Sequence, residues 1–393
     1  MTSAGLIDSL KRNWLHYAAL LLIVLIALSW RSGAISNFII PTWGNTMYHV
    51  GIERETIETG FYPKYELSYG GGFPNFYVPA YRMLVSSLSV ATGIDPMPMS
   101  GLVVLLLGLF CLLAIYVVAY RLSGNSYWVA LFAAFFFLMS PDITINTERP
   151  FPELMGLFLL PLTLYFLYRE DWPLATLSSI TMALTHQQSV LALVAIMGLY
   201  TFFQLAYAFL FTRKYQKALW SAVPVVAACG TIAAWLIFST GNLNILKIAQ
   251  VAYHEQWPVT LSTILQTGTF VLIFLVLGLV YVYGFPLLDL VRKPAREKPE
   301  KPQQKGKQKA SADAGPGYRL NITADGRLLL AAWMIASIIL TKNEMIHIFS
   351  FSLNTLQSRF YTYFVDAAIV LAGFGMYALL SAIDFRQLLE KPE

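Results

Sequence analysis

Five short stretches of this 393-residue chain concentrate carboxylates, histidines and arginines in a sequence in which only 12% of residues are charged. Carboxylates and histidines move protons in catalysis, and the arginine guanidinium matches the oxygens of phosphate. The stretches are GNTMYHVGIERETIETG (44–60), YGGGFPNFYVPAYR (69–82), SPDITINTERPFPELMGL (140–157), ALTHQQSVL (183–191) and LQSRFYTYFVDAAIVLAGFG (356–375).

The first stretch predicts a short amphipathic helix over 46–59, with Asn45 as its N-cap and Gly60 as its C-cap. His49 and Glu53 are four residues apart and therefore share one face of that helix. Two interpretations are open: an exposed, capped helix with paired charges, or a helix that presents an acid and a histidine to a site.

Three further positions combine a reactive side chain with a place at the end of an apolar run. Glu153 follows a proline at a helix start, where the helix dipole favours a carboxylate, and it is also a candidate second acid. His186 lies in a polar turn between two apolar runs and is a candidate ligand of a lipid phosphate. Arg359 opens the last apolar run as a candidate phosphate anchor, and Asp366 lies two turns further, inside that run.

The elements that position these residues are membrane helices. Apolar residues make up 57% of the chain, its mean hydropathy is +0.58, and runs of about 20 apolar residues recur. The sequence thus predicts an all-α integral membrane protein, a bundle of about ten transmembrane helices with a helical first outer loop. The predicted spans are 14–31, 98–120, 126–141, 153–168, 172–186, 188–211, 218–238, 263–290, 327–341 and 360–381.

We predict three regions: a transmembrane core over 1–291 with an outer loop at 32–97, a disordered basic linker over 292–326, and a transmembrane pair over 327–393. The linker prediction rests on its Pro-, Lys- and Gln-rich composition. A cytoplasmic N-terminus places 19 of the 27 Lys and Arg residues on the cytoplasmic side. We therefore expect a multi-pass protein of the cell membrane, with both termini cytoplasmic and the reactive stretches extracytoplasmic.

The stretches, in this order, resemble the GT-C superfamily of membrane glycosyltransferases. The resemblance is strongest to a prokaryotic multispan branch labelled as related to 6-pyruvoyl-tetrahydropterin synthase, a label that does not imply pterin chemistry. The matching motifs cover most of the chain apart from the linker. They are Tyr48–His49, ETGFYP (58–63), GGFPNFYVP (71–79), PEL (152–154), THQQS (185–189) and RF (359–360).

The resemblance implies transfer of a sugar from a polyprenyl-phosphate-linked donor to an acceptor glycan, lipid or protein on the outer face. It implies an acid of the first outer loop as general base, at the position of Asn45, with Glu53 and Glu153 as further candidate acids. The substrate-binding candidates that it implies are Tyr48, His49, Arg82, His186 and Arg359. Dolichyl or another polyprenyl phosphate and the membrane are the expected partners, and no nucleic acid is expected.

Asn45 departs from the pattern, because an amide has no useful basicity. Three interpretations follow: another carboxylate takes over, the chain is a non-catalytic relative that binds lipid-linked sugar or a partner protein, or an Asp→Asn substitution was introduced. A transporter is a further alternative, although the polar residues gather on one face and no repeat relates the two halves. No cofactor is required, and a divalent cation held by outer-face Glu and His residues stays open.

Overall fold

The computed structural model describes residues 13–36, 44–66, 73–75, 77–240, 258–284, 286, 320, 322–343, 347–348, 351–352 and 357–383. All structural statements below concern these residues. Most of the predicted linker 292–326 lies outside them, as do the glycines of the YGGGF stretch and the side chain of Asn45.

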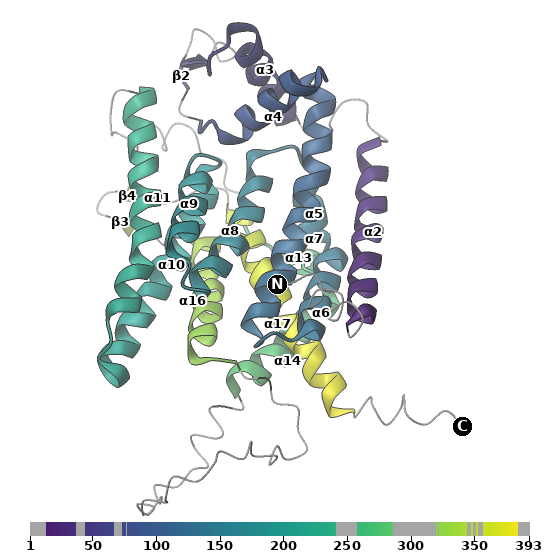
Figure 1. Cartoon of the computed structure of the whole chain (residues 1–393), viewed down its shortest axis with the longest axis vertical. Coiled ribbons are helices and arrows are strands. Elements are labelled where there is room, and N and C mark those ends of the chain that lie inside the picture. The colour runs from purple at the N-terminus through teal and green to yellow at the C-terminus, as the bar shows by residue number, and fades with distance from the viewer. Residues whose placement is uncertain are drawn as a thin grey trace, which may run out of the picture.

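The described chain is a bundle of roughly parallel and antiparallel helices with a smaller helical layer at one end (Figure 1). The bundle helices are α2 (Trp14–Ser36), α5 (Pro96–Leu122), α6 (Tyr127–Met139), α7 (Pro141–Thr147), α8 (Pro152–Tyr168), α9 (Trp172–Ala183), α10 (Gln187–Tyr207), α11 (Gln216–Thr240), α13 (Leu261–Gln266), α14 (Thr269–Leu279), α16 (Ala324–Thr341) and α17 (Gln357–Ala382). Two π-helical turns, η1 (Ala208–Thr212) and η2 (Val280–Gly284), extend α10 and α14.

The apolar runs of the sequence form these helices, as predicted. Six described helices are long and apolar enough to cross a membrane, and α6 with α7 makes a seventh candidate span that bends by 72°. Two shorter apolar helical segments, 152–168 and 269–284, lie beside them. The chain therefore has an all-α, multi-pass membrane fold, and the predicted number of ten spans stays a prediction.

The smaller layer is formed by α3 (Gly44–Thr59) and α4 (Ala80–Thr92), which lie above the ends of α5 and α8 in Figure 1. A hairpin of two short strands, β1 (Tyr65–Glu66) and β2 (Phe73–Pro74), connects them, and β3 (His347–Ile348) pairs with β4 (Phe351–Ser352) elsewhere. α3 begins at Gly44, so Asn45 lies inside the helix and not before it as predicted. Gly60 ends α3 with a left-handed φ of 75°, as its assignment as C-cap requires.

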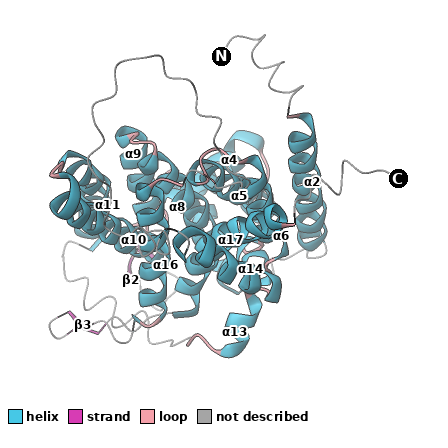
Figure 2. Ribbon diagram, turned by 90° about the horizontal axis from the view of Figure 1, so that it is seen from below, coloured by secondary structure: helices cyan, strands magenta, loops and turns pink. Residues whose placement is uncertain are grey.

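Helix α17 lies at the centre of the bundle (Figure 2). Its residues from Val365 to Gly375 are all buried, and it packs against α6, α14 and α16. Contact with α14 is close because Gly278 and Gly375 face each other without side chains. A Cβ at Gly278 would strike the Leu371 carbonyl, and one at Gly375 would strike the Phe274 carbonyl. The two backbones therefore set the position of the last helix.

Helix α2 lies at the edge of the bundle, against α5 and α6 (Figure 2). Near its end Arg31 turns inward and is only 2% exposed. Its guanidinium donates to the Thr147 hydroxyl at 2.6 Å and passes over Gly108, where a Cβ would come within 2.6 Å of Nε. The buried side chain of Arg31 thus joins α2 to the end of α7.

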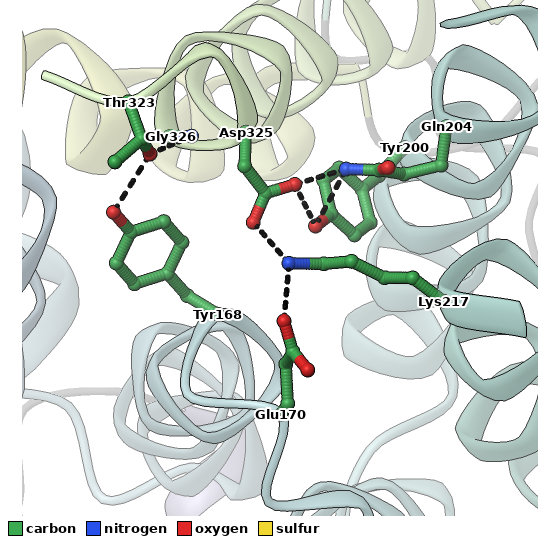
Figure 3. Close-up of polar contacts among 8 residues, drawn as sticks. All are labelled: Tyr168, Glu170, Tyr200, Gln204, Lys217, Thr323, Asp325 and Gly326. Carbon is green, nitrogen blue, oxygen red and sulfur yellow. Dashed lines mark hydrogen bonds and ion pairs between the residues drawn. The ribbon is translucent and has the colours of Figure 1, made fainter. Parts of the chain in front are cut away.

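The opposite end of the bundle from α3 and α4 is held by a polar cluster around Asp325, in the first turn of α16 (Figure 3). Its carboxylate accepts from Lys217 of α11 at 2.8 Å and from Tyr200 of α10 at 2.6 Å, and Gln204 also donates to it. Lys217 also contacts Glu170 in the α8–α9 turn at 2.7 Å. Four parts of the bundle therefore meet where α16 begins.

Replacing Gly278 by alanine is expected to lower the free energy of unfolding by about 1–3 kcal/mol, the usual cost of overpacking, because the clash is with backbone atoms. The matched control is Gly198→Ala in α10, whose Cβ would meet no atom within 4 Å. The control should be neutral or slightly stabilising, since alanine favours helix over glycine. Thermal unfolding in detergent measures both variants, and equal effects would contradict the close packing of α14 on α17.

Asp325→Asn is expected to destabilise the protein by about 1.5–3 kcal/mol, because Asp325 accepts several hydrogen bonds, one from an ammonium group, at 19% side-chain exposure. Glu170→Gln removes the other partner of Lys217 but should cost less than about 1 kcal/mol, because the Glu170 side chain is 54% exposed. The same unfolding assay compares them. A larger effect at Glu170 than at Asp325 would show that the cluster does not anchor α16.

Candidate functional site

The α3–α4 layer is organised around Arg82, which α4 buries completely. Its Nε donates to Nδ1 of His49 in α3 at 2.9 Å, and one terminal nitrogen donates to the Tyr62 hydroxyl at 2.9 Å. Tyr62 in turn donates to the carbonyl of Tyr77 at 3.2 Å. The guanidinium thus joins α4, after the hairpin, to two residues that precede it, His49 and Tyr62.

Aromatic rings enclose the same guanidinium. Its central carbon lies 4.7 Å from the ring centroid of Tyr48 and 4.5 Å from that of Tyr77. Cation–π contacts of this kind gain strength when water is excluded. The sequence singled out Tyr48, His49 and Arg82 as binding candidates, and the structure brings all three together. It adds Tyr77, which lies in the GGFPNFYVP motif but was not itself a candidate.

The hydrogen bond from Arg82 fixes the protonation of His49. An arginine nitrogen can only donate, so Nδ1 of His49 is an acceptor and the neutral ring carries its proton on Nε2. Burial lowers the pKa of His49 well below its ordinary value, and the nearby charges of Arg82, His186 and Arg359 lower it further. His49 is therefore a neutral N–H donor at physiological pH.

Glu53 lies one turn beyond His49 on the buried face of α3, with no exposed surface. One carboxyl oxygen accepts from Ser100 of α5 at 3.3 Å, and Oε1 has no hydrogen-bond partner among the described residues. Burial raises its pKa from 4.5 to about 8, against the opposing effects of Arg82 and Ser100. Glu53 is thus a protonated acid at neutral pH, packed between helices, and α3 is not the exposed helix that was the alternative interpretation.

A second group of polar residues lies where α8 and α17 begin. Glu153 of α8 is 4% exposed, and its Oε2 lies 3.7 Å from Nη1 of Arg359 in α17. The charge of Arg149 also acts on Glu153. Arg149 donates to Asn146 at 3.4 Å, and Asn146 donates to Thr362 of α17 at 2.9 Å. Two cations from different elements therefore surround one buried carboxylate.

The two groups lie close enough for their charges to act on each other. The charges of Arg359 and Glu153 both act on Tyr77, and those of His186 and Arg359 act on His49. The backbone joins them as well, because the N–H of Ala80 donates to the carbonyl of Leu184 at 2.7 Å. That bond fixes the start of α4 to the α9–α10 junction that carries His186.

The structure separates Asp366 from the rest of this constellation. Asp366 lies two turns beyond Arg359 on the same helix, as the spacing predicts. Arg359, however, pairs with Glu153, while Asp366 is 1% exposed in the middle of α17, where the charge of Asp142 of α7 acts on it. Backbone placement puts Asn45 in the first turn of α3, four residues before His49.

Among the described residues, no grouping of three or more His, Cys, Asp or Glu side chains fits a metal ion.

The fold is similar to that of membrane proteins of known structure. No known family description matches the sequence, and no curated protein sequence does either. The similarity is found in solved structures, at 13–15% sequence identity, so it concerns the fold.

The oligosaccharyltransferase AglB of Archaeoglobus fulgidus, in complex with an inhibitory peptide and a dolichol-phosphate, superposes with a TM-score of 0.58 and 13% identity over 97% of this chain and 52% of its own. ArnT of Cupriavidus metallidurans, bound to undecaprenyl phosphate, superposes with a TM-score of 0.53 and 15% identity. The match covers 97% of this chain and 62% of ArnT. The A. fulgidus oligosaccharyltransferase in complex with Zn and sulfate superposes with a TM-score of 0.58 and 14% identity. The match covers 94% of this chain and 50% of that protein. The chain thus spans half to about three fifths of the length of these proteins.

The protonated Glu53 makes a pH-dependent contribution to the stability of α3. Between pH 4.5 and about 8, Glu53 keeps its proton while α3 is packed on the bundle and loses it when α3 detaches. The free energy needed to detach α3 should therefore fall as the pH rises through this window. The slope is about 1.4 kcal/mol per pH unit at most. Hydrogen–deuterium exchange of α3, corrected for intrinsic rates, measures it.

Glu53→Gln should remove this slope and make α3 more protected than in the wild type at pH 8. Glu58→Gln, at an exposed position of the same helix, is the matched control and should keep the wild-type slope. The same slope in Glu53→Gln and in the wild type would contradict the burial of a proton at Glu53.

Proposed function

We propose that the chain is a membrane glycosyltransferase that transfers a sugar from a polyprenyl-phosphate-linked donor to an acceptor hydroxyl or amide. The observation that carries this proposal is the Glu153–Arg359 pair beside Arg82, His49 and His186, at one end of a GT-C fold. Such a site offers a buried carboxylate for an acceptor proton and guanidinium groups for a leaving phosphate. AglB and ArnT structures with dolichol-phosphate and undecaprenyl phosphate support the class of donor.

In the proposed reaction the acceptor oxygen or nitrogen bonds to the anomeric carbon of the sugar, and the bond from that carbon to the phosphate oxygen breaks. The acceptor proton goes to Glu153, and the electron pair leaves with the lipid phosphate. Arg359 binds this phosphate, because a guanidinium offers two parallel N–H groups to its oxygens. Its 3.7 Å contact with Glu153 is long for an ion pair, so a phosphate can compete for it and leave the carboxylate to the acceptor.

The other candidate residues take supporting roles in this proposal. Arg82 holds His49 as a neutral N–H donor, and Tyr48 and Tyr77 shield that pair from water. Glu53 holds its proton at neutral pH, so it positions α3 against α5 and does not act as base. Asn45 stands where the resemblance places an acid, and Glu153 replaces it. No step runs through a metal ion.

We place this site on the extracytoplasmic face, with both termini in the cytoplasm, on the basis of the Lys and Arg distribution. The order of the motifs supports the 6-pyruvoyl-tetrahydropterin synthase-related branch of the GT-C superfamily. The proposed partners are the lipid-linked sugar and an acceptor glycan, lipid or protein. In this arrangement the linker 292–326 connects a core over 1–291 to a final pair over 327–393.

A non-catalytic relative that binds lipid-linked sugar is the second candidate function, and Asn45 favours it. Native mass spectrometry separates the two functions. A scaffold would co-purify with an enzyme subunit and would leave a bound donor unchanged. A transporter would instead carry a solute into proteoliposomes and lose that activity in Asp366→Asn.

Purified protein is expected to transfer or hydrolyse the sugar of a radiolabelled polyprenyl-phosphate donor. Glu153→Gln should lower that rate by about a hundredfold or more, since general-base catalysis contributes this much. Asn45→Asp should raise it by supplying a second acid near His49. Glu170→Gln, at the far end of the bundle, is the control for acid substitution and should act like the wild type. Inertness of both wild type and Asn45→Asp would refute the proposal.

A further inference from the structure

A chain of hydrogen bonds leads from His186 into the centre of the bundle. Nδ1 of His186 lies 2.9 Å from the Ser189 hydroxyl, which lies 2.5 Å from the hydroxyl of Tyr363 in α17. Ser189 and Tyr363 have no exposed surface, and His186 is 4% exposed. The donor chemistry proposed above uses neither contact.

The backbone sets the direction of this chain. The amide N–H of Ser189 donates to Nδ1 of His186 at 3.4 Å, so Nδ1 carries a lone pair and no proton. The single hydroxyl hydrogen of Ser189 can then only be donated to that same nitrogen. Ser189 must accept from Tyr363, and the neutral His186 ring keeps its proton on Nε2, on the side away from Ser189.

The surrounding helices make room for this arrangement and fix it. A Cβ on Gly156 of α8 would collide with the Ser189 hydroxyl, so the absence of a side chain there admits Ser189 between α8 and α17. Tyr363 lies one turn beyond Arg359 on α17, and the charges of Glu153 and Arg359 act on it. The hydrogen-bond chain is thus built into the same helices that carry the proposed site.

Electrostatics favour a neutral donor at this position. The charge of Arg359 acts on His186, and a second proton on the ring would place two cations beside each other. Nε2 of His186 makes no hydrogen bond to any residue in the described part of the chain. A phosphate oxygen bound by Arg359 could accept this N–H. That oxygen would have to lie beside Nε2, on the side of the His186 ring that faces away from Ser189.

We infer that Ser189 and Tyr363 are positioning residues that hold His186 as a neutral Nε2–H donor for the phosphate of the lipid carrier. The inference rests on the proposed function for the identity of the ligand. It assigns a role to Tyr363, which lies 174 residues from Ser189 in the sequence. The simpler alternative is that His186 only caps α10 through its contact with the Ser189 N–H.

The first experiment measures the tautomer without any ligand. In nitrogen-15 NMR of histidine-labelled protein at pH 7, the His186 signals are assigned by their loss in His186→Asn. We expect a proton on Nε2 only. In Tyr363→Phe we expect a second population protonated on Nδ1, because the Ser189 hydroxyl can then accept from Nδ1 and only the long 3.4 Å contact from the Ser189 N–H opposes that proton. A wild-type ring protonated on Nδ1 or on both nitrogens, or an unchanged spectrum in Tyr363→Phe, would overturn the inference.

The second experiment compares the binding of farnesyl phosphate with that of farnesol, which lacks the phosphate. The wild type should prefer the phosphate, and His186→Asn, which keeps a capping side chain, should lose about ten- to hundredfold of that preference. His186→Gln should recover part of it, since its amide reaches the Nε2 position. Tyr363→Phe should lose less of the preference than His186→Asn. Tyr361→Phe, a substitution on the same helix as Tyr363 that breaks a 2.7 Å bond to Thr267, should lose none.

The outcomes separate the two proposals. If the wild type prefers farnesyl phosphate and His186→Asn prefers it equally, His186 is only a cap and the inference is wrong while the proposed function stands. If the wild type shows no preference for the phosphate, the proposed function fails, and with it the role of His186 as a phosphate donor. The tautomer measured by NMR then still decides whether Ser189 and Tyr363 position the ring.

Discussion

The site end of this molecule depends on the burial of one cation. Arg82 has no exposed surface, so its guanidinium must be satisfied by the protein. His49, Tyr62 and the rings of Tyr48 and Tyr77 meet that demand. Each comes from a different point along the 44–77 segment, so satisfying the charge folds that segment over the bundle.

The same interaction determines the chemistry of its neighbours. Because Arg82 donates to His49, the histidine is neutral and directs an N–H away from the arginine. At the second group, Ser189 places His186 in the same protonation state by a different route. In the proposed site, two neutral donors near Arg359 would offer hydrogen bonds to an anion without adding repulsion among cations.

Sequence patterns predicted the helices because long apolar runs admit few other structures in a membrane. The helical period also placed His49 and Glu53 on one face, and both are buried. The pattern did not reveal that Glu53 faces Ser100, or that Arg359 pairs with Glu153 and not with its own helix. Those contacts join elements distant in sequence, so helix packing decides them. Ser189 and Tyr363, 174 residues apart, are a further example.

Arg31 has a consequence for the order in which the protein is made. Its partner Thr147 lies 116 residues further along the chain, and Gly108 lies between them in sequence. When α2 leaves the ribosome, none of these contacts exists, and an isolated guanidinium is costly in hydrocarbon. Arg31 must then reach for the water at the membrane surface until α5 to α7 arrive. Helix α2 therefore takes its final position beside α5 and α6 only after α5 to α7 have been synthesised.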